Sequence, residues 1–303
     1  MLFAKGSAVE NNRIKDISDQ IARMSFWSGP VSPQPLPGGI TNTNFVVHDG
    51  AEKYVVRIGD DLPLHGILRT HEVSASRAAH AADLAPEIVH HESGVLVMRF
   101  IEGSTLTAQG IANEETLERL AALLRGCHTR MKNHLHGATP MFWVFQVCRN
   151  YLQSARNGES RVANQLDRLD AMNVEFEEAV GAIEPVFCHN DLLPANFIDD
   201  GERIWLIDWE YAGWNSALFD LANLSSNCEL TSKFENHLLK TYYGRDVDPQ
   251  TIHRFRAFRC ASLLRETLWS VVQEIYSQLD FDYAAYSDEQ FARLEKAYSK
   301  YKD

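Results

Sequence analysis

Short apolar runs separated by turn residues fill the first third of the chain. Together with the extended, proline-rich segment before them, these runs predict five strands, at 33–37, 45–47, 53–58, 87–89 and 94–98. Apolar or small residues recur at helical spacing over 12–25 and 69–82, which predicts a leading helix and a helix between the strands. We therefore expect an antiparallel five-stranded sheet with helices packed against it.

After residue 103 the apolar positions follow a helical period almost throughout. Asn113 is a suitable N-cap, and Ser287 with Gln290 forms a capping box. Helices are predicted from Asn113 onwards and over 141–155, 162–172, 176–183, 231–243, 249–279 and 288–301. The chain is thus predicted to be α+β, with an N-terminal lobe at 1–98, a hinge at 99–103 and a mainly helical lobe at 104–303.

A hairpin interrupts the helical part and places two oxygen ligands together. Apolar residues at 197–198 and 203–207 flank an Asp-Asp-Gly-Glu turn, which predicts two paired strands. Asn196 precedes the first strand and Asp208 follows the second, so both are expected at the open end of the hairpin. An amide and a carboxylate oxygen suit Mg²⁺, which also takes ligands from substrate phosphates. Asp191 lies one loop earlier and is free to act as a base.

Each of three features in the N-terminal lobe allows two interpretations. The loop from Gly38 to Asn44 either lets backbone N–H groups approach phosphate or is an ordinary turn. Arg57 is the only charge within an apolar run, which indicates either an exposed edge position or a phosphate contact. Glu72 either pairs with Arg57 or is a solvated carboxylate in a first helical turn.

Composition and charge narrow the class of protein. The chain has 303 residues, a net charge of -12 and a sequence pI near 5.5, which disfavours nucleic-acid binding and agrees with a cationic substrate or with simple solubility. Five scattered cysteines without a C-x-x-C motif indicate reduced core thiols. No signal peptide and no long apolar run are evident, so a cytoplasmic protein without stable membrane insertion is expected. A homodimer stays possible.

The motifs taken in order resemble the choline/ethanolamine kinase and aminoglycoside phosphotransferase superfamily, bacterial-type choline kinases included. The matching stretches are G-G-I-T-N-T-N at 38–44, R-F-I-E-G at 99–103, H-N-D-L-L-P-A-N at 189–196 and I-D-W-E at 207–210, with Arg57 and Glu72 between them. The resemblance implies a protein-kinase-like, two-lobed fold and an ATP:alcohol phosphotransferase that uses ATP and Mg²⁺.

The resemblance also implies a role for each matching residue. Asp191 would accept the proton of the substrate hydroxyl, and Asn196 and Asp208 would hold Mg²⁺. His189 and Asp220 would brace the catalytic loop by hydrogen bonds. The nucleotide would contact Gly38, Gly39, Ile40, Thr41, Asn42, Asn44, Arg57, Glu72, Arg99 and Ile101. Protein kinases use lysine where this chain has Arg57, and an arginine cannot replace lysine atom by atom.

A second resemblance concerns the substrate. L-W-S-V-V-Q at 268–273 and F-D-Y-A-A-Y at 281–286 resemble the segment of choline kinases whose rings enclose a quaternary ammonium. The substrate is therefore expected to contact Glu210, Tyr211, Trp214, Glu266, Trp269, Tyr283 and Tyr286. Core packing is the alternative for such aromatic residues.

The chain departs from the choline kinase pattern at Glu266. Choline kinases commonly have a further tryptophan about where this residue stands, so the aromatic enclosure is incomplete or a carboxylate favours a protonated amine. Choline is the expected substrate, and ethanolamine, thiamine and an aminoglycoside are the alternatives.

Two further classes of protein fit less well. A kinase-fold protein that binds a cation without turnover is disfavoured because Asp191, Asn196 and Asp208 are all present. A protein kinase is disfavoured because Asp208 and Asp220 are too close in sequence for a long activation segment.

Overall fold

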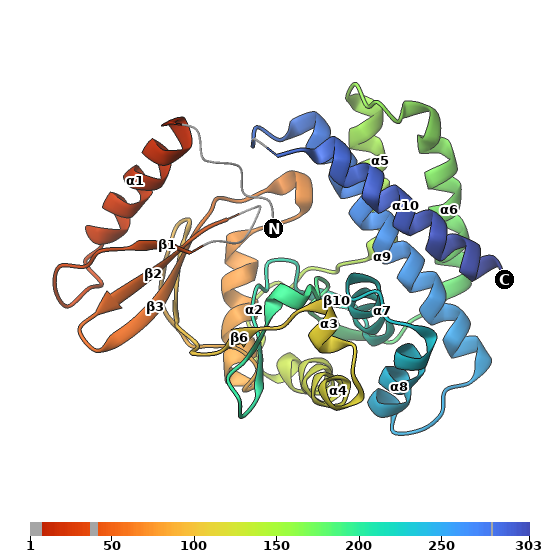
Figure 1. The fold of residues 1–303 in the computed structure, drawn as a ribbon, viewed down its shortest axis with the longest axis horizontal. Coiled ribbons are helices and arrows are strands. Elements are labelled where there is room, and N and C mark those ends of the chain that lie inside the picture. The colour runs from red at the N-terminus through yellow and green to blue at the C-terminus, as the bar shows by residue number, and fades with distance from the viewer. Residues whose placement is uncertain (1–7, 37–41, 280) are drawn as a thin grey trace.

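The computed structural model describes residues 8–36, 42–279 and 281–303 (Figure 1). Helices and strands are mixed, as predicted, and a sheet-containing part stands beside a larger, mainly helical part. Among the described residues, no helix combines the length and the apolar composition needed to span a membrane. All five cysteines are buried and free, which confirms the prediction of core thiols.

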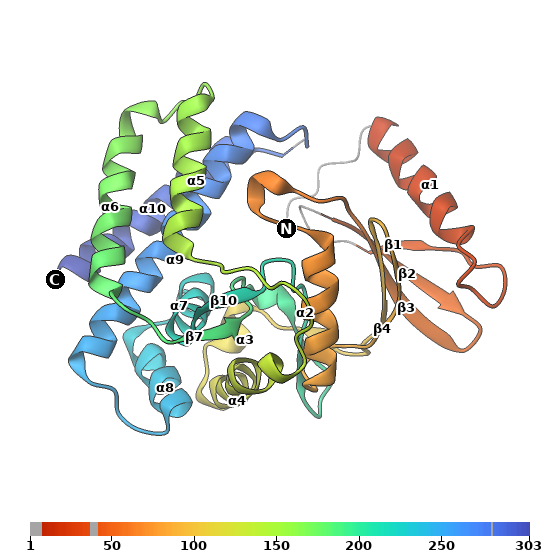
Figure 2. The ribbon, with the colours of Figure 1, turned by 180° about the vertical axis from the view of Figure 1, so that it is seen from behind.

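The N-terminal part is a five-stranded antiparallel sheet with the strand order β1-β2-β3-β5-β4. Its strands are β1 (Gln34–Leu36), β2 (Thr43–Asp49), β3 (Glu52–Ile58), β4 (Ile88–Glu92) and β5 (Val95–Arg99). Helix α1 (Ala8–Ala22) packs apolar residues such as Ile17 and Ile21 on one face. Helix α2 (Arg69–Ala81) lies on the side that faces the rest of the molecule (Figure 2). The expected five-stranded sheet with packed helices is therefore present.

The small residues of α2 join it to the main core. Ala75, Ala78 and Ala79 are fully buried and belong to the same apolar cluster as the C-terminal helices. Alanine side chains allow helices to approach closely, because they add little volume at the contact. A short 3₁₀ helix, η1 (Pro63–His65), precedes α2 and brings His65 into this core.

The C-terminal part is mainly helical and is built around one long helix, α9 (Pro249–Tyr276), which packs against α5, α6, α7 and α10. The remaining elements, in chain order, are β6 (Ser104–Thr105), α3 (Ala108–Ile111), α4 (Glu114–Arg130), η2 (Met131–Asn133), α5 (Val144–Asn157), η3 (Ala163–Gln165), α6 (Leu166–Val180), β7 (Pro185–Cys188), η4 (Pro194–Asn196), β8 (Phe197–Asp199), β9 (Ile204–Leu206), β10 (Gly213–Ser216), α7 (Ala217–Asn227), α8 (Ser232–Tyr243) and α10 (Tyr283–Lys302). The predicted hairpin is β8 paired antiparallel with β9. The hinge at 99–103 stays a prediction.

Two predicted helix boundaries are wrong. The helices expected at 162–172 and 176–183 are the single helix α6, because Asn173 does not break the helix but points inward and donates to the carbonyl of Phe145 at 3.0 Å. The last helix does not begin at the Ser287 capping box. Asp282 caps it instead, accepting from the Ala285 amide at 2.9 Å, and Ser287 lies within the helix.

Candidate active site

The loop that carries Asp191 begins where β7 ends. Asn190 has a φ of 68°, in the left-handed region that asparagine tolerates better than most residues. Its side-chain amide donates to the carbonyl of Tyr211 at 3.0 Å, which fixes this turn against the following segment. The chain therefore leaves the strand sharply just before Asp191.

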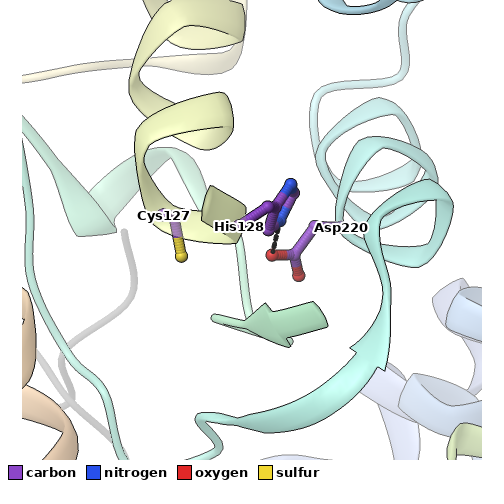
Figure 3. A group of neighbouring side chains, drawn as sticks. All are labelled: Cys127, His128 and Asp220. Atoms are coloured by element: carbon purple, nitrogen blue, oxygen red, sulfur yellow. Dashed lines mark hydrogen bonds and ion pairs between the residues drawn. The ribbon is translucent and has the colours of Figure 1, made fainter. Parts of the chain in front are cut away.

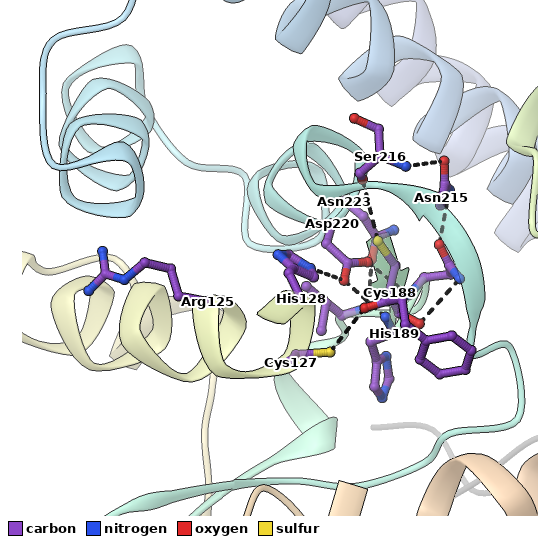
Figure 4. Close-up of polar contacts among 12 residues, drawn as sticks. Arg125, Cys127, His128, Cys188, His189, Asn215, Ser216, Asp220 and Asn223 are labelled. Atoms are coloured by element: carbon purple, nitrogen blue, oxygen red, sulfur yellow. Dashed lines mark hydrogen bonds and ion pairs between the residues drawn. The ribbon is translucent and has the colours of Figure 1, made fainter. Parts of the chain in front are cut away.

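Asp220, at the start of α7, holds this loop in place (Figure 4). Its Oδ2 accepts from the backbone amide of His189 at 2.9 Å, and its Oδ1 accepts from the backbone amide of Asn190 at 2.8 Å. His128 on α4 donates to the same carboxylate at 2.9 Å if its Nε2 is protonated. Burial acts to raise the pKa of Asp220, but these hydrogen bonds and the neighbouring histidines lower it below its ordinary value.

Cys127, His128 and Asp220 form a buried group whose spacing would suit a metal ion (Figure 3). Each side chain already has a protein partner, since the Cys127 thiol contacts the carbonyl of Phe187 at 3.6 Å and Asp220 binds the loop amides. Burial raises the pKa of the Cys127 thiol well above its ordinary value, which disfavours the thiolate that a metal needs. We interpret this group as part of the support of the loop.

The hairpin brings Asn196 and Asp208 to the same end, beside Asp191. The backbone amide of Ile207 donates to the Asn196 carbonyl at 3.0 Å, and the Asn196 side-chain amide donates to the Asp191 carbonyl at 2.8 Å. The Asn196 side-chain nitrogen is thereby used, so its Oδ1 is the atom available to a cation. Asp208 has a φ of 68°, a sharp turn at the point where its carboxylate enters the site.

The ion pair predicted between Arg57 on β3 and Glu72 on α2 is present, with 2.5 Å between the nitrogen and the oxygen. The same guanidinium nitrogen lies 2.7 Å from Oδ1 of Asp208. Arg57 Nε is buried and has no partner in the described part of the chain. Arg57 is therefore an internal cation at the junction of the two halves of the molecule and not an edge residue.

Arg69 was not predicted and extends this network. It lies 2.7 Å from Glu72 and 3.0 Å from Glu210, and Glu210 also accepts from Asn42 at 3.0 Å. Arg69 precedes Glu72 by one helical turn, a pairing signal in the sequence that depends on knowing where the helix begins. Charges of alternating sign thus connect the sheet and α2 with the segment after β9.

The two carboxylates on that segment titrate differently. Burial acts to raise the pKa of Asp208, but the charge of Arg57 and its hydrogen bond lower it below the ordinary range. Burial and the charge of Asp208 instead raise the pKa of Glu210 to about 7. Asp208 is therefore the carboxylate that remains ionised and suited to a divalent cation.

Arg265 on α9 was also missed, and it contacts Asp191 directly. Its Nη1 lies 3.1 Å from Oδ1 of Asp191 and 3.1 Å from Oε2 of Glu266. Burial raises the pKa of Asp191 to about 6, against the lowering effect of Arg265. The signal in the sequence was an arginine within a long apolar helix, next to a glutamate, but only the fold shows which loop it faces.

Three aromatic residues predicted to bind the substrate lie close together, and one of them contacts Glu266. The Trp269 ring lies 6.1 Å from the Tyr283 ring and 6.3 Å from the Tyr286 ring, and the Tyr286 hydroxyl donates to Glu266 Oε1 at 2.7 Å. His65 joins them from η1, with its ring 6.1 Å from that of Trp269. His65 was not among the predicted residues, because it comes from a distant part of the sequence.

Tyr211 and Trp214 are close in sequence but contact different parts of the protein. Tyr211 is buried and its ring supports the Arg265 guanidinium at 4.6 Å. Trp214 donates to Thr139 at 2.7 Å and packs edge-on against Phe187. Within the described ranges, no interaction joins Trp214 to Asp191 or Trp269, so its assignment to the substrate site stays a prediction.

The predicted nucleotide contacts are described only in part. Residues Gly38, Gly39, Ile40 and Thr41 lie outside the described residues. The amide of Arg99 donates to the Glu87 carbonyl at 3.0 Å, and its side chain pairs with Glu52 and Glu87. The backbone amide of Ile101 has no partner within the described ranges and is available to a ligand. On β2, Oδ1 of Asn44 is buried and likewise lacks a partner there.

A cavity of about 720 Å³ reaches His65, which contacts Trp269, and Glu210, which pairs with Arg69. Tyr211, Phe142 and Trp143 also line it. Its wall is more apolar than polar, with few charged groups, a composition common in small-molecule sites.

Comparison with known proteins decides the family. Residues 34–243 match the family described as Choline/ethanolamine kinase. The chain belongs to the choline/ethanolamine kinase family. It is 30% identical to Protein LicA of Haemophilus influenzae over 257 residues, which cover 82% of this chain and 75% of LicA. It is 25% identical to Ethanolamine kinase 2 of Homo sapiens over 278 residues, which cover 82% of this chain and 71% of that protein.

A solved structure agrees with this assignment. The structure of LicA in complex with AMP superposes with a TM-score of 0.77 at 25% identity, covering 98% of this chain and all of that one (100%). The predicted kinase activity and kinase-like fold are therefore confirmed. The choline/ethanolamine kinase family fits phosphorylation of the hydroxyl of a small amino alcohol.

Proposed function

We propose that this kinase transfers the γ-phosphoryl group of Mg²⁺-bound ATP to the hydroxyl of choline. The observation that carries the proposal is the cluster of the Trp269, Tyr283 and Tyr286 rings. Tyr286 donates to Glu266, and Glu266 contacts Arg265, the partner of Asp191. Choline carries its hydroxyl and its quaternary ammonium two carbons apart. This spacing fits a site in which the base and the aromatic cluster are neighbours.

The reaction requires few groups from the protein. The substrate oxygen forms a bond to the γ-phosphorus, the bond from that phosphorus to the bridging oxygen breaks with its electron pair leaving on ADP, and the hydroxyl proton goes to Asp191. Asp191 Oδ2 accepts no hydrogen bond from a described residue, whereas Oδ1 is held by Arg265. The free oxygen is the atom that would receive the proton.

The residues beside Asp191 fit a magnesium ion. Asn196 Oδ1 and the Asp208 carboxylate are hard oxygen donors, and the lowered pKa of Asp208 keeps it charged. Mg²⁺ bound there would neutralise phosphate charge that develops during transfer. Arg57 would bind phosphate through its unpartnered Nε, with Glu72 orienting it.

The remaining nucleotide contacts follow from placing the phosphates beside Arg57 and the magnesium ion. The loop at 38–44 would cover the phosphates, and the hinge at 99–103 between two lobes would meet the adenine through Ile101. That LicA was solved in complex with AMP supports nucleotide binding by this chain. Free buried thiols and the use of ATP support a cytoplasmic location.

Ethanolamine is the second candidate, because the family includes kinases of both alcohols and Glu266 stands beside the aromatic group. A protonated amine needs hydrogen-bond acceptors, whereas choline needs only apolar and π contacts. Glu266 accepts from Tyr286, and its charge is compensated by Arg265 3.1 Å away, which weakens its attraction for an amine and favours choline.

The test is a panel of alcohols with the purified protein. ADP release with Mg²⁺ and ATP is measured with choline, ethanolamine, thiamine and an aminoglycoside, each against a sample without alcohol. We expect the largest kcat/KM with choline. No increase with choline would overturn the proposal, and choline-dependent thermal stabilisation without ADP release would indicate binding alone.

A further inference from the structure

Arg265 is a buried cation in the middle of the reaction site. Its side chain is only 3% exposed, although it comes from the long helix α9 and not from the catalytic loop. Burial of a guanidinium is unfavourable unless carboxylates compensate it, and here the compensating groups are Asp191 and Glu266. One of them is the proposed base.

The two carboxylate oxygens of Asp191 differ in their contacts. Oδ1 accepts from Arg265 at 3.1 Å, and Oδ2 has no donor among the described residues. The Arg265 guanidinium cannot move freely, because it rests on the Tyr211 ring at 4.6 Å and faces the Phe142 ring at 5.9 Å. The Asp191 carboxylate is therefore oriented through an oxygen that does not react.

A continuous series of contacts links this carboxylate to the aromatic group. The Tyr286 hydroxyl donates to Glu266 Oε1 at 2.7 Å, and Glu266 Oε2 lies 3.1 Å from Arg265 Nη1. The same nitrogen contacts Asp191, so three side chains from α9 and α10 precede the base in this series. Tyr286 and Trp269 are the rings proposed to meet the substrate cation.

We propose that Arg265 is a positioning residue, which orients Asp191 toward the substrate hydroxyl and couples that orientation to the cation-binding aromatic residues. This inference rests on the proposed function. Arg265, Asp191 and Glu266 together leave one negative charge when both carboxylates are ionised, which matches a substrate with one positive charge.

Removal of the guanidinium separates positioning from binding. In Arg265→Met the apolar length is kept, Asp191 loses its orienting contact, and the net charge of the group changes from one to two negative charges. We expect kcat for choline to fall about 100-fold, as for other misplaced catalytic groups. The KM for choline should stay equal or fall, since a more negative pocket attracts the cation. A residue that only bound the substrate would raise KM instead.

Two measurements and two further variants distinguish loss of folded protein from loss of positioning. Rates are expressed per nucleotide-binding site counted by calorimetry, and melting temperatures are compared. Arg265→Lys retains the charge with a different geometry and should recover part of kcat. Arg259→Met is the matched control, because Arg259 lies on the same helix but pairs with Glu235 at 3.2 Å, and it should keep kcat within about 2-fold.

A double variant decides between orientation and charge alone. Arg265→Met combined with Glu266→Gln restores the single negative charge without restoring the contact to Asp191. We expect its kcat to remain low, and a return to the wild-type kcat would overturn the positioning role. A wild-type kcat per site in Arg265→Met alone would overturn it as well.

Failure of the proposed function can be distinguished from failure of the inference about Arg265. If the wild-type protein phosphorylates no alcohol of the panel, the proposed function is wrong, and the variants are compared by ATP hydrolysis, in which water replaces the hydroxyl. Arg265→Met should then hydrolyse ATP more slowly than Arg259→Met, and equal rates would overturn the inference.

Discussion

Arg57 lies 2.7 Å from Asp208, and this ion pair connects the five-stranded sheet with the segment that follows β9. The same arginine binds Glu72 at 2.5 Å, so one guanidinium serves a carboxylate from each half of the molecule. A ligand that enters between these halves must share Arg57 with Asp208. Phosphate and a divalent cation can do so together. The phosphate replaces Asp208 as the partner of Arg57, and the cation replaces Arg57 as the partner of Asp208.

Substitution of Arg57 should therefore weaken ATP use. In Arg57→Met we expect KM for ATP to rise about 10-fold or more and kcat to fall, because a charge-assisted phosphate contact worth roughly 1.5–3 kcal/mol is lost. Steady-state kinetics at varied ATP checks this. Arg203→Met is the control, since Arg203 lies on the β8–β9 hairpin and pairs with Asp83. An equal change in both variants would contradict the prediction.

The support of the loop by Asp220 predicts a loss of stability. In Asp220→Asn, an amide replaces an oxygen that faces the backbone amides of His189 and Asn190, so one donor is left facing another. We expect the free energy of unfolding in urea to fall by about 3 kcal/mol. Asp246→Asn removes an exposed ion pair with Lys240 and should change it by less than about 1 kcal/mol. Similar values for both variants would refute the bracing role.

His65 predicts a pH dependence of stability. Burial, together with the charge of Arg265, lowers the pKa of His65 to about 4 despite the hydrogen bond with Gln273. The unfolded chain binds a proton near pH 6.5 that the folded chain does not bind, so stability falls as the pH drops from about 6.5 toward 4. Between pH 7 and pH 5 this one group contributes a loss of about 2 kcal/mol.

The matching experiment compares the wild type with His65→Gln, which cannot titrate. Urea unfolding at pH 7 and pH 5 gives the acid-induced loss for each protein, and the loss should be smaller in the variant by about 2 kcal/mol. Equal losses would show that His65 is protonated in the folded protein at pH 5, contrary to its buried position between Tyr151 and Gln273.

Trp269 predicts how the substrate cation is recognised. In Trp269→Leu a ring is lost from the group that includes Tyr283 and Tyr286, and KM for choline should rise by roughly 10- to 30-fold, given a cation–π contact of about 2 kcal/mol. The KM for ATP should not change. Trp205→Leu, on the hairpin beside Arg203, is the control. An unchanged KM for choline would place the cation elsewhere.

The sequence was most informative where a short segment determines its own geometry. The hairpin at β8 and β9 follows from its turn residues and brings Asn196 and Asp208 together without information about the rest of the fold. The pairing of Arg57 with Glu72 was also predictable, because a strand and the next helix had to meet. The overall order of sheet and helices followed from apolar periodicity.

The partners that the sequence did not reveal come from distant elements. Arg265 and Asp191 are 74 positions apart in the sequence, and His128 and Asp220 are 92 positions apart. No local sequence pattern therefore predicts either contact. Glu266 was expected to replace a ring and face the substrate, but its oxygens are used by Tyr286 and Arg265. The merging of two predicted helices into α6 has a similar cause, since a buried hydrogen bond of Asn173 is a tertiary contact.

Asp191 is the proposed acceptor of the proton from the choline hydroxyl, and its replacement by asparagine removes that basic oxygen. Phosphocholine formation is followed by ³¹P NMR for the wild type and for Asp191→Asn, with nucleotide binding of both measured by calorimetry. We predict that the variant binds Mg²⁺ and ATP like the wild type but forms phosphocholine at least about 100-fold more slowly. Formation at a near-wild-type rate by the variant would show that Asp191 is not the base.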